Sequence, residues 1–284
     1  MSKRRAVAAA ILAVWVLVLG WHVRREYFRP EASRLAAAAR RLPPGTAYYA
    51  LYQGDRRAGW AQREVDTLPL ASGFHLRDLL VIELPDLGPA GMTEARTDAW
   101  LGPTLALRRF AVQASSPADT TRVQGRVEGD TAIVLAVARG SAWDSVRRRV
   151  RGPVDLEGTW PPRLAATARS EPGERYEVRL LDPLSLESRP EVIEVLERGM
   201  RTFPDSADSD TASGVWYAAR EDTVAALRVE RGAGASTLEA WVDVDGRIVS
   251  GDLKAGLRMV RTAFELAFFD RRPGGPTTRR EPRP

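Results

Sequence analysis

Cysteine is absent from the 284-residue sequence, and only two histidines, His22 and His75, are present. The lack of cysteine excludes disulfides, thiolate metal ligands, cysteine nucleophiles and a lipidated cysteine. Two histidines are too few for a histidine-based zinc site. A serine triad would need His75, and the Gly-x-Ser-x-Gly turn that presents such a serine is missing. We therefore expect no catalytic residue, no metal site and no cofactor site, although plentiful acidic residues leave a carboxylate-based enzyme open.

Lysine is almost absent as well, since Lys3 and Lys254 are the only lysines among 42 cationic residues. The other cations are arginines, and 37 acidic residues spread among them leave a net charge of only +5. No groove-reading helix or base-stacking motif accompanies this charge, so nucleic acid is not an expected partner. The densest basic cluster, Arg147-Arg148-Arg149 with Arg151, is typical of an exposed edge strand. Anionic lipid head groups are the alternative interpretation of that cluster.

An uninterrupted apolar run extends from Ala6 to Trp21, shortly after two arginines and a lysine. As a helix this run would be roughly 24 Å long, and arginines that snorkel toward the surface extend it toward the ~30 Å hydrocarbon core of a bilayer. The alternative is a cleaved signal peptide, which needs small residues after the run. Trp21, His22 and Arg24 are bulky or charged instead. The sequence therefore predicts a retained membrane anchor over residues 1–23.

This anchor predicts a single-pass protein of the bacterial inner membrane. A short basic N-terminal tail normally stays in the cytoplasm, and a long domain after the anchor is translocated largely regardless of its charge. The arginines that follow the anchor make its downstream flank as basic as its upstream flank. Charge balance alone therefore does not decide the orientation. From the length of the following domain, we expect that domain in the periplasm or otherwise outside the cytoplasm.

Three further segments follow the anchor. Residues 24–45 carry apolar side chains at helical spacing and end at Pro43-Pro44-Gly45, which predicts a helical stalk and linker. Residues 46–270 are expected to form one main domain. Residues 271–284 are rich in proline, glycine and arginine, a composition that predicts a disordered basic tail.

The main domain alternates polar and apolar residues with a period of two, for example over 121–128, 176–180 and 238–244. Asp245-Gly246 is a strong signal for a two-residue hairpin turn, and turn signals recur about every ten residues. The pattern predicts a mainly β fold, as an antiparallel sheet or partial barrel. Tryptophans in or beside these strands are expected to pack in the core. They are Trp60, Trp100, Trp143, Trp216 and Trp241.

Two segments interrupt the β pattern. A short helix is expected within residues 153–168, after a Trp-Pro-Pro sequence. Residues 206–213 are polar and predict a loop. Asp205, Asp208 and Asp210 lie beside or within this loop, but their spacing does not match a calcium-binding EF-hand. We therefore expect a solvated acidic loop rather than a calcium site.

Residues 256–269 are expected to form a C-terminal amphipathic helix. Leu257, Val260, Phe264 and Ala267 would share one face of this helix, opposite polar residues and arginines. Such an apolar stripe is too large to leave in water, and the β domain is its nearest partner. The helix should therefore cover one face of the sheet, with Phe264 buried.

Several short motifs resemble those of a known family. They are YQGDRRAGW at residues 52–60, LLDP at 180–183, AWVDVDGRI at 240–248 and KAGL at 254–257. This pattern is similar to the extracytoplasmic β domain that precedes the catalytic domain in bacterial membrane-anchored transglutaminase-like proteins. That catalytic domain uses a Cys-His-Asp arrangement, and this chain has no cysteine. The resemblance therefore implies a stand-alone β module, and a fold-level analogy to LolA-type periplasmic carriers implies a curved sheet.

Two functions fit these expectations. The first is a non-enzymatic binding or scaffolding module, tethered to the bilayer and engaging another membrane protein or complex. The second is a carrier or sensor that holds a lipid or other apolar ligand in the curved sheet. A pocket volume discriminates between them, because a sheet closed by Leu257, Val260 and Phe264 favours scaffolding and an open apolar cavity favours the carrier.

Overall fold

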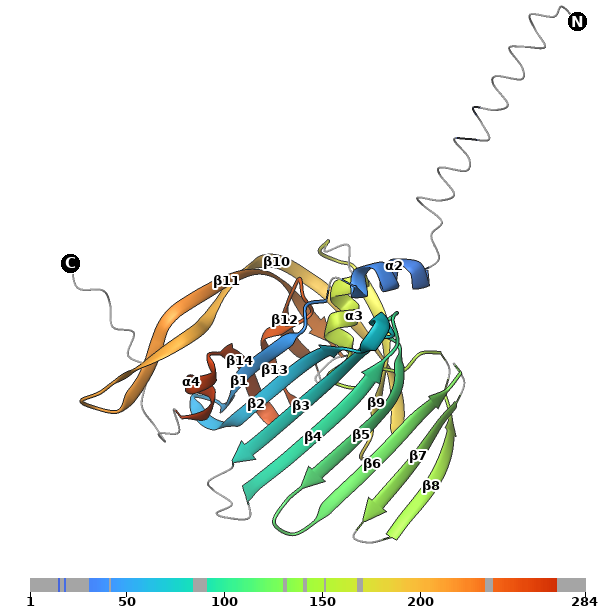
Figure 1. Cartoon of the computed structure of the whole chain (residues 1–284), viewed down its shortest axis with the longest axis horizontal. Helices are drawn as coiled ribbons and strands as arrows, with labels where there is room; N and C mark the ends of the chain where they lie inside the picture. The colour runs from blue at the N-terminus through green and yellow to red at the C-terminus, as the bar shows by residue number, and fades with distance from the viewer. Residues whose placement is uncertain are drawn as a thin grey trace, which may run out of the picture.

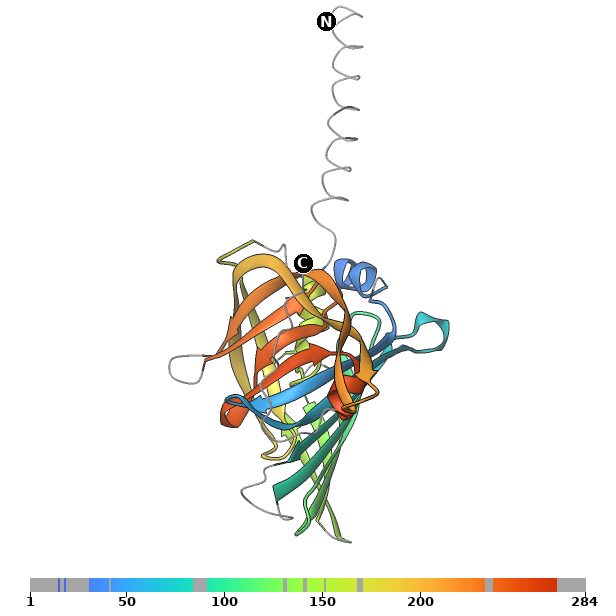
Figure 2. The same cartoon turned by 90° about the vertical axis from the view of Figure 1, so that its left-hand side faces the viewer.

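The computed structural model describes Trp15, Val18 and residues 31–40, 42–83, 91–129, 132–139, 142–150, 152–167, 171–232 and 237–269. Within these residues the chain forms one antiparallel sheet of 14 strands, in the order β8-β7-β6-β5-β4-β3-β2-β1-β14-β13-β12-β11-β10-β9. The sheet curves strongly, as Figures 1 and 2 show, and its two edge strands, β8 and β9, do not pair with each other. The prediction of a mainly β, antiparallel domain is thus confirmed.

The elements follow one another along the chain with short connections. The first eight strands are β1 (Gly45–Gln53), β2 (Arg56–Thr67), β3 (Phe74–Glu83), β4 (Met92–Leu101), β5 (Leu107–Ser115), β6 (Thr120–Glu128), β7 (Ala132–Arg139) and β8 (Ala142–Arg149). The others are β9 (Arg175–Asp182), β10 (Glu187–Asp210), β11 (Val215–Arg231), β12 (Leu238–Asp243), β13 (Ile248–Asp252) and β14 (Leu257–Thr262). The helices are α2 (Glu31–Ala39), α3 (Trp160–Thr167) and α4 (Phe264–Phe268), with 3₁₀ turns η1 (Pro69–Ala71) and η4 (Lys254–Gly256).

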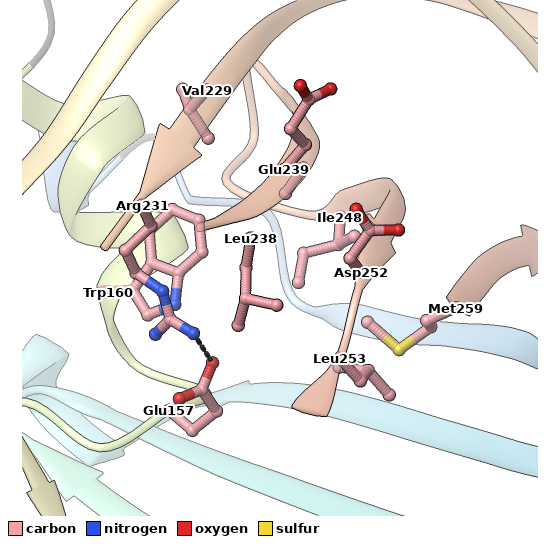
Figure 3. Close-up of a pocket in the computed structure, with 12 residues that line it drawn as sticks. Glu157, Trp160, Val229, Arg231, Leu238, Glu239, Ile248, Asp252, Leu253 and Met259 are labelled. Atoms are coloured by element: carbon pink, nitrogen blue, oxygen red, sulfur yellow. Dashed lines mark ion pairs between the residues drawn. The ribbon is translucent and has the colours of Figure 1, made fainter. Parts of the chain in front are cut away.

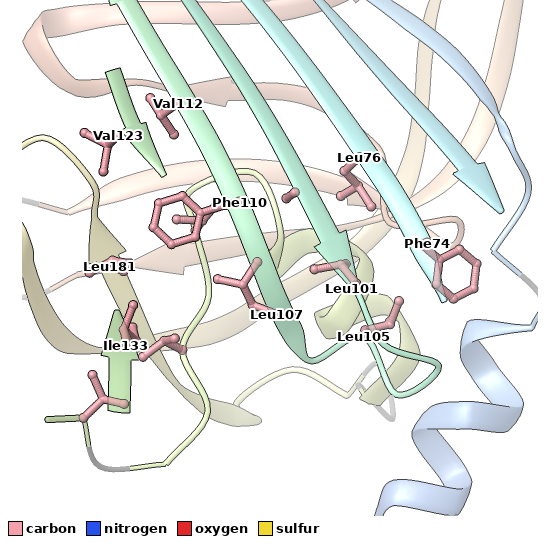
Figure 4. Packing of buried hydrophobic residues seen from close by; sticks show 14 of the residues in the cluster. Phe74, Leu76, Leu101, Leu105, Leu107, Phe110, Val112, Val123, Ile133 and Leu181 are labelled. Carbon is pink, nitrogen blue, oxygen red and sulfur yellow. The ribbon is translucent and has the colours of Figure 1, made fainter. Parts of the chain in front are cut away.

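The concave side of the sheet holds the largest buried cluster, part of which is drawn in Figure 4. Residues of β3 to β7 point into it alternately, because successive side chains of a strand point to opposite faces. Phe110 is 2% exposed, and its ring lies against Gly125 on β6. A Cβ atom at Gly125 would come within 2.2 Å of that ring. This glycine therefore lets Phe110 fill the core between two paired strands.

The connection after β8 runs through the interior and lies against the free edge of β9. The backbone N–H of Asp155 donates to Arg179 O, and the N–H of Leu181 donates to Asp155 O, both at 2.8 Å. Trp160 and Leu164 of α3, which follows, are buried in a second apolar cluster with residues of β9 to β12. The short helix expected within residues 153–168 is therefore present, and it packs inside the curve against β9 to β12.

The helix α2 lies at one end of the curved sheet, beside α3 (Figure 1). Leu35 is 6% exposed and Ala39 is 1% exposed, and Ala39 belongs to the same cluster as Phe74 and Leu101. This helix is thus packed on the β domain. Among the described residues, no helix is long and apolar enough to cross a membrane. The predicted anchor at 1–23, apart from Trp15 and Val18, and the predicted disordered tail at 271–284 lie outside the described residues.

The C-terminal helix expected over residues 256–269 is wrong for most of its length. Residues 257–262 form β14, which pairs with β1 on one side and with β13 on the other. Leu257 and Met259 are buried while Arg258 between them is exposed, so the period that matters here is two. Spacings of three and four also fit this apolar-rich run, and hydrogen bonds to two neighbouring strands decide in favour of the strand. Only α4 is helical.

The polar loop expected over residues 206–213 is also wrong. β10 continues to Asp210 and β11 begins at Val215, so only the four residues between them form the turn. The position of the turn at Asp245-Gly246 is confirmed, since the N–H of Gly246 donates to Asp243 O at 3.0 Å. Its expected length of two residues is wrong, because four residues connect β12 to β13. Gly246 has a φ of 72°, and a Cβ there would approach Pro162 Cα to 2.3 Å. Glycine is therefore needed at this hairpin for both its backbone conformation and its contact with α3.

Candidate interaction surface

A two-stranded ribbon projects from the sheet where β10 and β11 outrun their neighbours. β9 pairs with β10 only up to residue 194, and β12 pairs with β11 only from residue 226. Within the described part of the chain, residues 200–210 and 215–225 therefore pair only with each other. Figures 1 and 2 show that this ribbon, drawn in orange, bends back over the sheet until its far end lies beside α4.

One buried aromatic residue holds the ribbon on the sheet. Phe203 is 3% exposed and packs with Ala226 and Val249. The guanidinium of Arg261 on β14 lies 4.0 Å from the centre of the Phe203 ring, and Arg261 is also paired with Asp243 at 3.0 Å. A two-stranded ribbon alone is marginal in water, so these contacts determine whether the ribbon stays docked.

Aromatic rings connect the far end of the ribbon to α4 and to the strands beneath. Trp216 on β11 stacks with Phe269 at 5.6 Å between ring centres. Phe264 and Phe268 of α4 lie 5.1 and 5.8 Å from the ring of Tyr48 on β1. Trp60 on β2 lies 4.2 Å from Phe268. We call these six residues the aromatic surface: Tyr48, Trp60, Trp216, Phe264, Phe268 and Phe269.

Two rings of the aromatic surface remain open to solvent. Phe264 is 41% exposed and Phe269 is 57% exposed, although both touch other rings. The expectation that Phe264 is buried and closes the core is therefore wrong. The helix does reach the sheet, because Arg57 Nη2 donates to Ala267 O at 2.6 Å and Ala267 is buried. Clustered exposed aromatic side chains are typical of sites that contact another protein.

The tryptophans expected in the core lie mainly elsewhere. Trp143 on β8 is 50% exposed, and the other four named above are only partly buried. Trp241 is covered on its face by the guanidinium of Arg201, which lies 3.5 Å from the ring centre. Among the described tryptophans, only Trp160 of α3 is buried. The indole ring of tryptophan is apolar but carries one N–H group that needs a hydrogen-bond partner. Partly covered positions on the outer side of the sheet therefore suit tryptophan better than the core does.

The candidate chemical residues are bound up in structural contacts. His75 Nε2 lies 2.9 Å from Asp98 Oδ1, and its ring stacks on Trp100 at 4.6 Å. Asp205 pairs with Arg220, and Asp208 accepts the backbone N–H of Ser209 at 2.8 Å. Among the described residues, no group of three or more acidic or histidine side chains is arranged to hold a metal ion.

The interior contains a cavity of about 20 Å³ between α3 and strands β11 to β14, shown in Figure 3. This volume is enough for about one water molecule. Trp160, Arg231, Leu238 and Met259 line it, and Arg231 pairs with Glu157 at 2.6 Å. Among the described residues, this pocket is therefore too small for the apolar ligand of the carrier hypothesis.

Buried charges reinforce the packing around α3. Asp155 is fully buried and accepts from Arg163 Nη1 at 2.9 Å and from Thr159 Oγ1 at 3.3 Å. Burial raises the pKa of the Asp155 carboxyl, and Arg163 and Thr159 oppose the rise without cancelling it. Burial also raises the pKa of Asp243 against the N–H groups of its turn and Arg261. The Asp155 carboxyl thus holds the connection between β8 and α3, and the Asp243 carboxyl holds the turn between β12 and β13.

Comparison with known proteins adds information about the fold. No family model and no curated protein matches the sequence. One similar solved structure is a β-barrel-like protein of the domain of unknown function DUF1849 from Brucella abortus. It is 14% identical, covers 78% of this chain and 95% of its own, and has a TM-score of 0.51. A DUF1089 family protein from Pseudomonas aeruginosa is 12% identical, covers 75% of this chain and 91% of its own, and has a TM-score of 0.36.

At these identities the first similarity shows a shared fold alone, and the second is too weak to support an argument. The resemblance to the β domain of transglutaminase-like proteins remains a prediction. Local sequence patterns do not reveal the aromatic surface, although one signal is present: Phe268-Phe269 directly follows an apolar segment, and Trp216 and Tyr217 come soon after the polar residues 206–213. Their proximity depends on how far the ribbon bends, which no local pattern specifies.

Proposed function

We propose that the protein is a non-enzymatic binding or scaffolding module, tethered to the inner membrane by residues 1–23, with its β domain outside the cytoplasm. On this proposal it engages another membrane protein through the aromatic surface. The observation that carries the proposal is the exposure of Phe264 and Phe269 within a cluster of six rings. Aromatic side chains supply much of the binding free energy at protein interfaces.

The packed interior supports binding at the surface over carriage of a ligand inside. The described cavity has room for about one water molecule, whereas a lipid chain needs a much larger volume. Helix α3 occupies the interior of the curve, with Trp160 and Leu164 buried. To accept an apolar ligand there, α3 would have to leave its place, which exposes a large buried area to water.

The aromatic surface is also placed where a partner can reach it. It is formed by α4, by the outer residues of β1 and β2, and by the far end of the ribbon. Among the described residues, neither edge of the ribbon pairs with a further strand beyond the sheet. Extended partners commonly add a strand to such an edge. A partner that covers Phe264 and Phe269 would therefore find both apolar area and free backbone groups nearby.

The proposal is tested by crosslinking in native membranes. Because the chain has no cysteine, a single Glu265→Cys change gives one unique site beside Phe264, to which a photoreactive group is attached. We expect an adduct with a membrane protein, and its loss when Phe264→Ala and Phe269→Ala are added. Met200→Ala with Tyr217→Ala is the matched control, because it removes two large exposed side chains outside the aromatic surface.

Two results would count against the proposal. Adducts with lipid alone, at equal yield in both double variants, would favour the carrier of an apolar ligand. Release of the full chain from membranes by carbonate would refute the proposed membrane tether, since a spanning apolar segment resists that treatment. The anchor itself is tested by Leu17→Arg, which should weaken membrane insertion by about 2.5–3.5 kcal/mol near the centre of the helix.

A further inference from the structure

The outer face of β5 to β8 carries far more positive than negative charge. Residues directly opposite each other in neighbouring strands point to the same face of a sheet. By this register Arg109 on β5 lies opposite Arg126 on β6, and Val134 on β7 lies between Arg126 and Arg147 on β8. The same register puts Arg122 and Arg149 on this face. We call these five residues the arginine face: Arg109, Arg122, Arg126, Arg147 and Arg149.

One carboxylate serves the whole arginine face. Glu128 on β6 accepts from Arg126 Nη2 at 2.6 Å and from Arg147 Nη2 at 3.0 Å. Among the described residues, neither Arg122 nor Arg149 forms an ion pair with an acidic side chain. Arg122 Nε donates to the neutral side chain of Gln113 at 3.2 Å. The strands β5 to β8 present no other acidic side chain on this face. Within the described residues of β5 to β8, five guanidinium groups therefore face solvent with a single neutralising carboxylate.

The direct pairing of Arg109 with Arg126 is unfavourable without an additional anion. Like charges directly opposite each other destabilise an antiparallel pair. Arg109 gains a partial compensation, because its guanidinium lies 4.1 Å from the centre of the Trp100 ring. All five arginines are exposed, and the side chains of Arg126 and Arg147 are 70% and 68% exposed. An anionic surface placed against this face would relieve the repulsion.

The position of the arginine face identifies the kind of anionic surface. Trp100 and Arg109 lie beside Leu101 and Leu107, which share a cluster with Ala39 of α2. The face thus begins at the end of the sheet where the chain enters from its N-terminal segment. Only the seven residues 24–30 separate the predicted anchor from α2. Even fully extended, that link reaches at most roughly 25 Å.

A further aromatic side chain fits a lipid surface. Trp143 on β8 lies opposite Ala138 on β7, which puts it on the same face as the arginines, and it is 50% exposed. Tryptophan is favoured at the boundary between lipid head groups and water. The apolar positions of β7 on this face are small, so the arginines and Trp143 project beyond them.

We propose that the arginine face binds the anionic head groups of the membrane in which the chain is anchored. This inference rests on the proposed tether. The face would lay one side of the β domain against the bilayer and so fix the direction in which the aromatic surface points. Arginine donates several hydrogen bonds to phosphate in a fixed geometry, which suits phospholipid head groups.

The test uses the full chain in lipid nanodiscs, with a fluorescent donor on one introduced cysteine and an acceptor on the lipid. Gln124→Cys places the donor on the arginine face, at an exposed position between Arg122 and Arg126. Ala219→Cys places it on the exposed ribbon as a control. We expect greater energy transfer from position 124 in discs with about one-third phosphatidylglycerol than in neutral discs, because basic residues are attracted to anionic lipid. The gain should disappear at high salt.

A matched pair of variants assigns the effect to the arginine face. Arg126→Gln, Arg147→Gln and Arg149→Gln together should abolish the dependence on anionic lipid. Arg175→Gln, Arg198→Gln and Arg258→Gln remove the same charge from exposed positions elsewhere and should preserve it. Thermal unfolding of each triple variant verifies that its fold is retained.

The outcomes separate this inference from the tether itself. Chains that fail to remain with the discs after carbonate treatment would refute the tether. Chains that remain, yet show equal energy transfer in neutral and anionic discs, would refute the arginine face alone. The inference would also be overturned if both triple variants lost the effect equally. Binding of a single-stranded oligonucleotide in neutral discs, with no response to anionic lipid, would assign the face to nucleic acid instead.

Discussion

The curved sheet and the ribbon that leaves it are built from the same two strands, β10 and β11, yet they differ in what stabilises them. Near their inner ends, Ile193, Val195 and Val229 are completely buried against α3. Beyond residue 200 the same strands pair only with each other, and Phe203 is the main buried side chain. The two strands stay paired, with irregularities near Pro204 and Ser206, while burial almost stops.

This difference shows which property the sequence pattern reports. Alternation of polar and apolar residues in the sequence indicates which face of a strand is buried. Hydrogen bonding between the backbones of two strands produces no pattern in the sequence. The inner parts of the strands therefore look like strands, whereas the ribbon looks like a loop. The exposure of the ribbon also agrees with the proposed binding function, since segments with little burial are often the ones that move and bind partners.

The sharpest test of the comparison is Phe110→Ala in the curved sheet. Phe110 is 2% exposed, and its ring fills the space that a side chain at position 125 would occupy. We expect the free energy of unfolding of the full chain to fall by about 3–5 kcal/mol, the usual range for a buried aromatic residue. Chemical denaturation followed by circular dichroism measures it. A loss below about 1 kcal/mol would mean that the sheet is packed differently.

A second test is Phe203→Ala in the ribbon, where an equally buried ring should matter less. The substitution removes the contacts with Ala226, Val249 and Arg261. Because the ribbon can separate while the sheet stays folded, the global cost is limited to the free energy of docking, about 1–3 kcal/mol. Hydrogen exchange should speed up in residues 200–225 and stay unchanged in β3 to β7. Uniformly faster exchange would show that ribbon and sheet unfold as one unit.

The same contrast explains how much of the fold could be predicted. Strong alternation identified the β class and the segments that became β6, β9 and β12. The Asp245-Gly246 turn was readable because φ above zero favours glycine. The strand at 257–262 was mistaken for a helix, because its apolar spacing suits both periods and its partners lie far away in sequence. Pairing with β1, about 210 residues earlier, leaves no local trace.

The two surfaces were less predictable than the fold. The arginine cluster at 147–149 is visible in the sequence, and β8 is indeed an edge strand. Its extension to Arg109 and Arg126 depends on the register of three hairpins. That register is set partly by the turn at Ser116, whose N–H donates to Asp119 O at 2.8 Å. The aromatic surface depends on the bend of the ribbon, which arises from irregular pairing near Pro204 and Ser206.

A third test uses pH to probe the packed connection between β8 and α3. Burial raises the pKa of Asp155 above its usual value of 3.8, so the folded protein holds this proton more tightly than the unfolded chain. Its contribution to stability is complete below pH 3.8 and is lost as the pH rises through the raised value. The stability of the natural protein relative to Asp155→Asn should therefore increase on acidification from pH 7 toward pH 4. Denaturation curves of both proteins across this range measure the difference, and a constant difference would contradict the burial of Asp155.

The smallest effect is expected for Phe264→Ala, which separates exposed from buried aromatic residues most directly. Phe264 is 41% exposed, and its contacts are edge and tilted contacts with Tyr48, Phe268 and Phe269. Such pairs contribute about 0.5–1.5 kcal/mol each at best, and the remaining rings can close part of the gap. We expect the free energy of unfolding to fall by about 1 kcal/mol or less, with Phe110→Ala measured alongside. The matched control is Ala267→Asp, because Ala267 is 1% exposed. This substitution puts a charge into the contact between α4 and β2 and should release the helix from the sheet. If Phe264→Ala cost as much as Phe110→Ala, the ring would belong to the core, and the aromatic surface would have no free side chain for a partner.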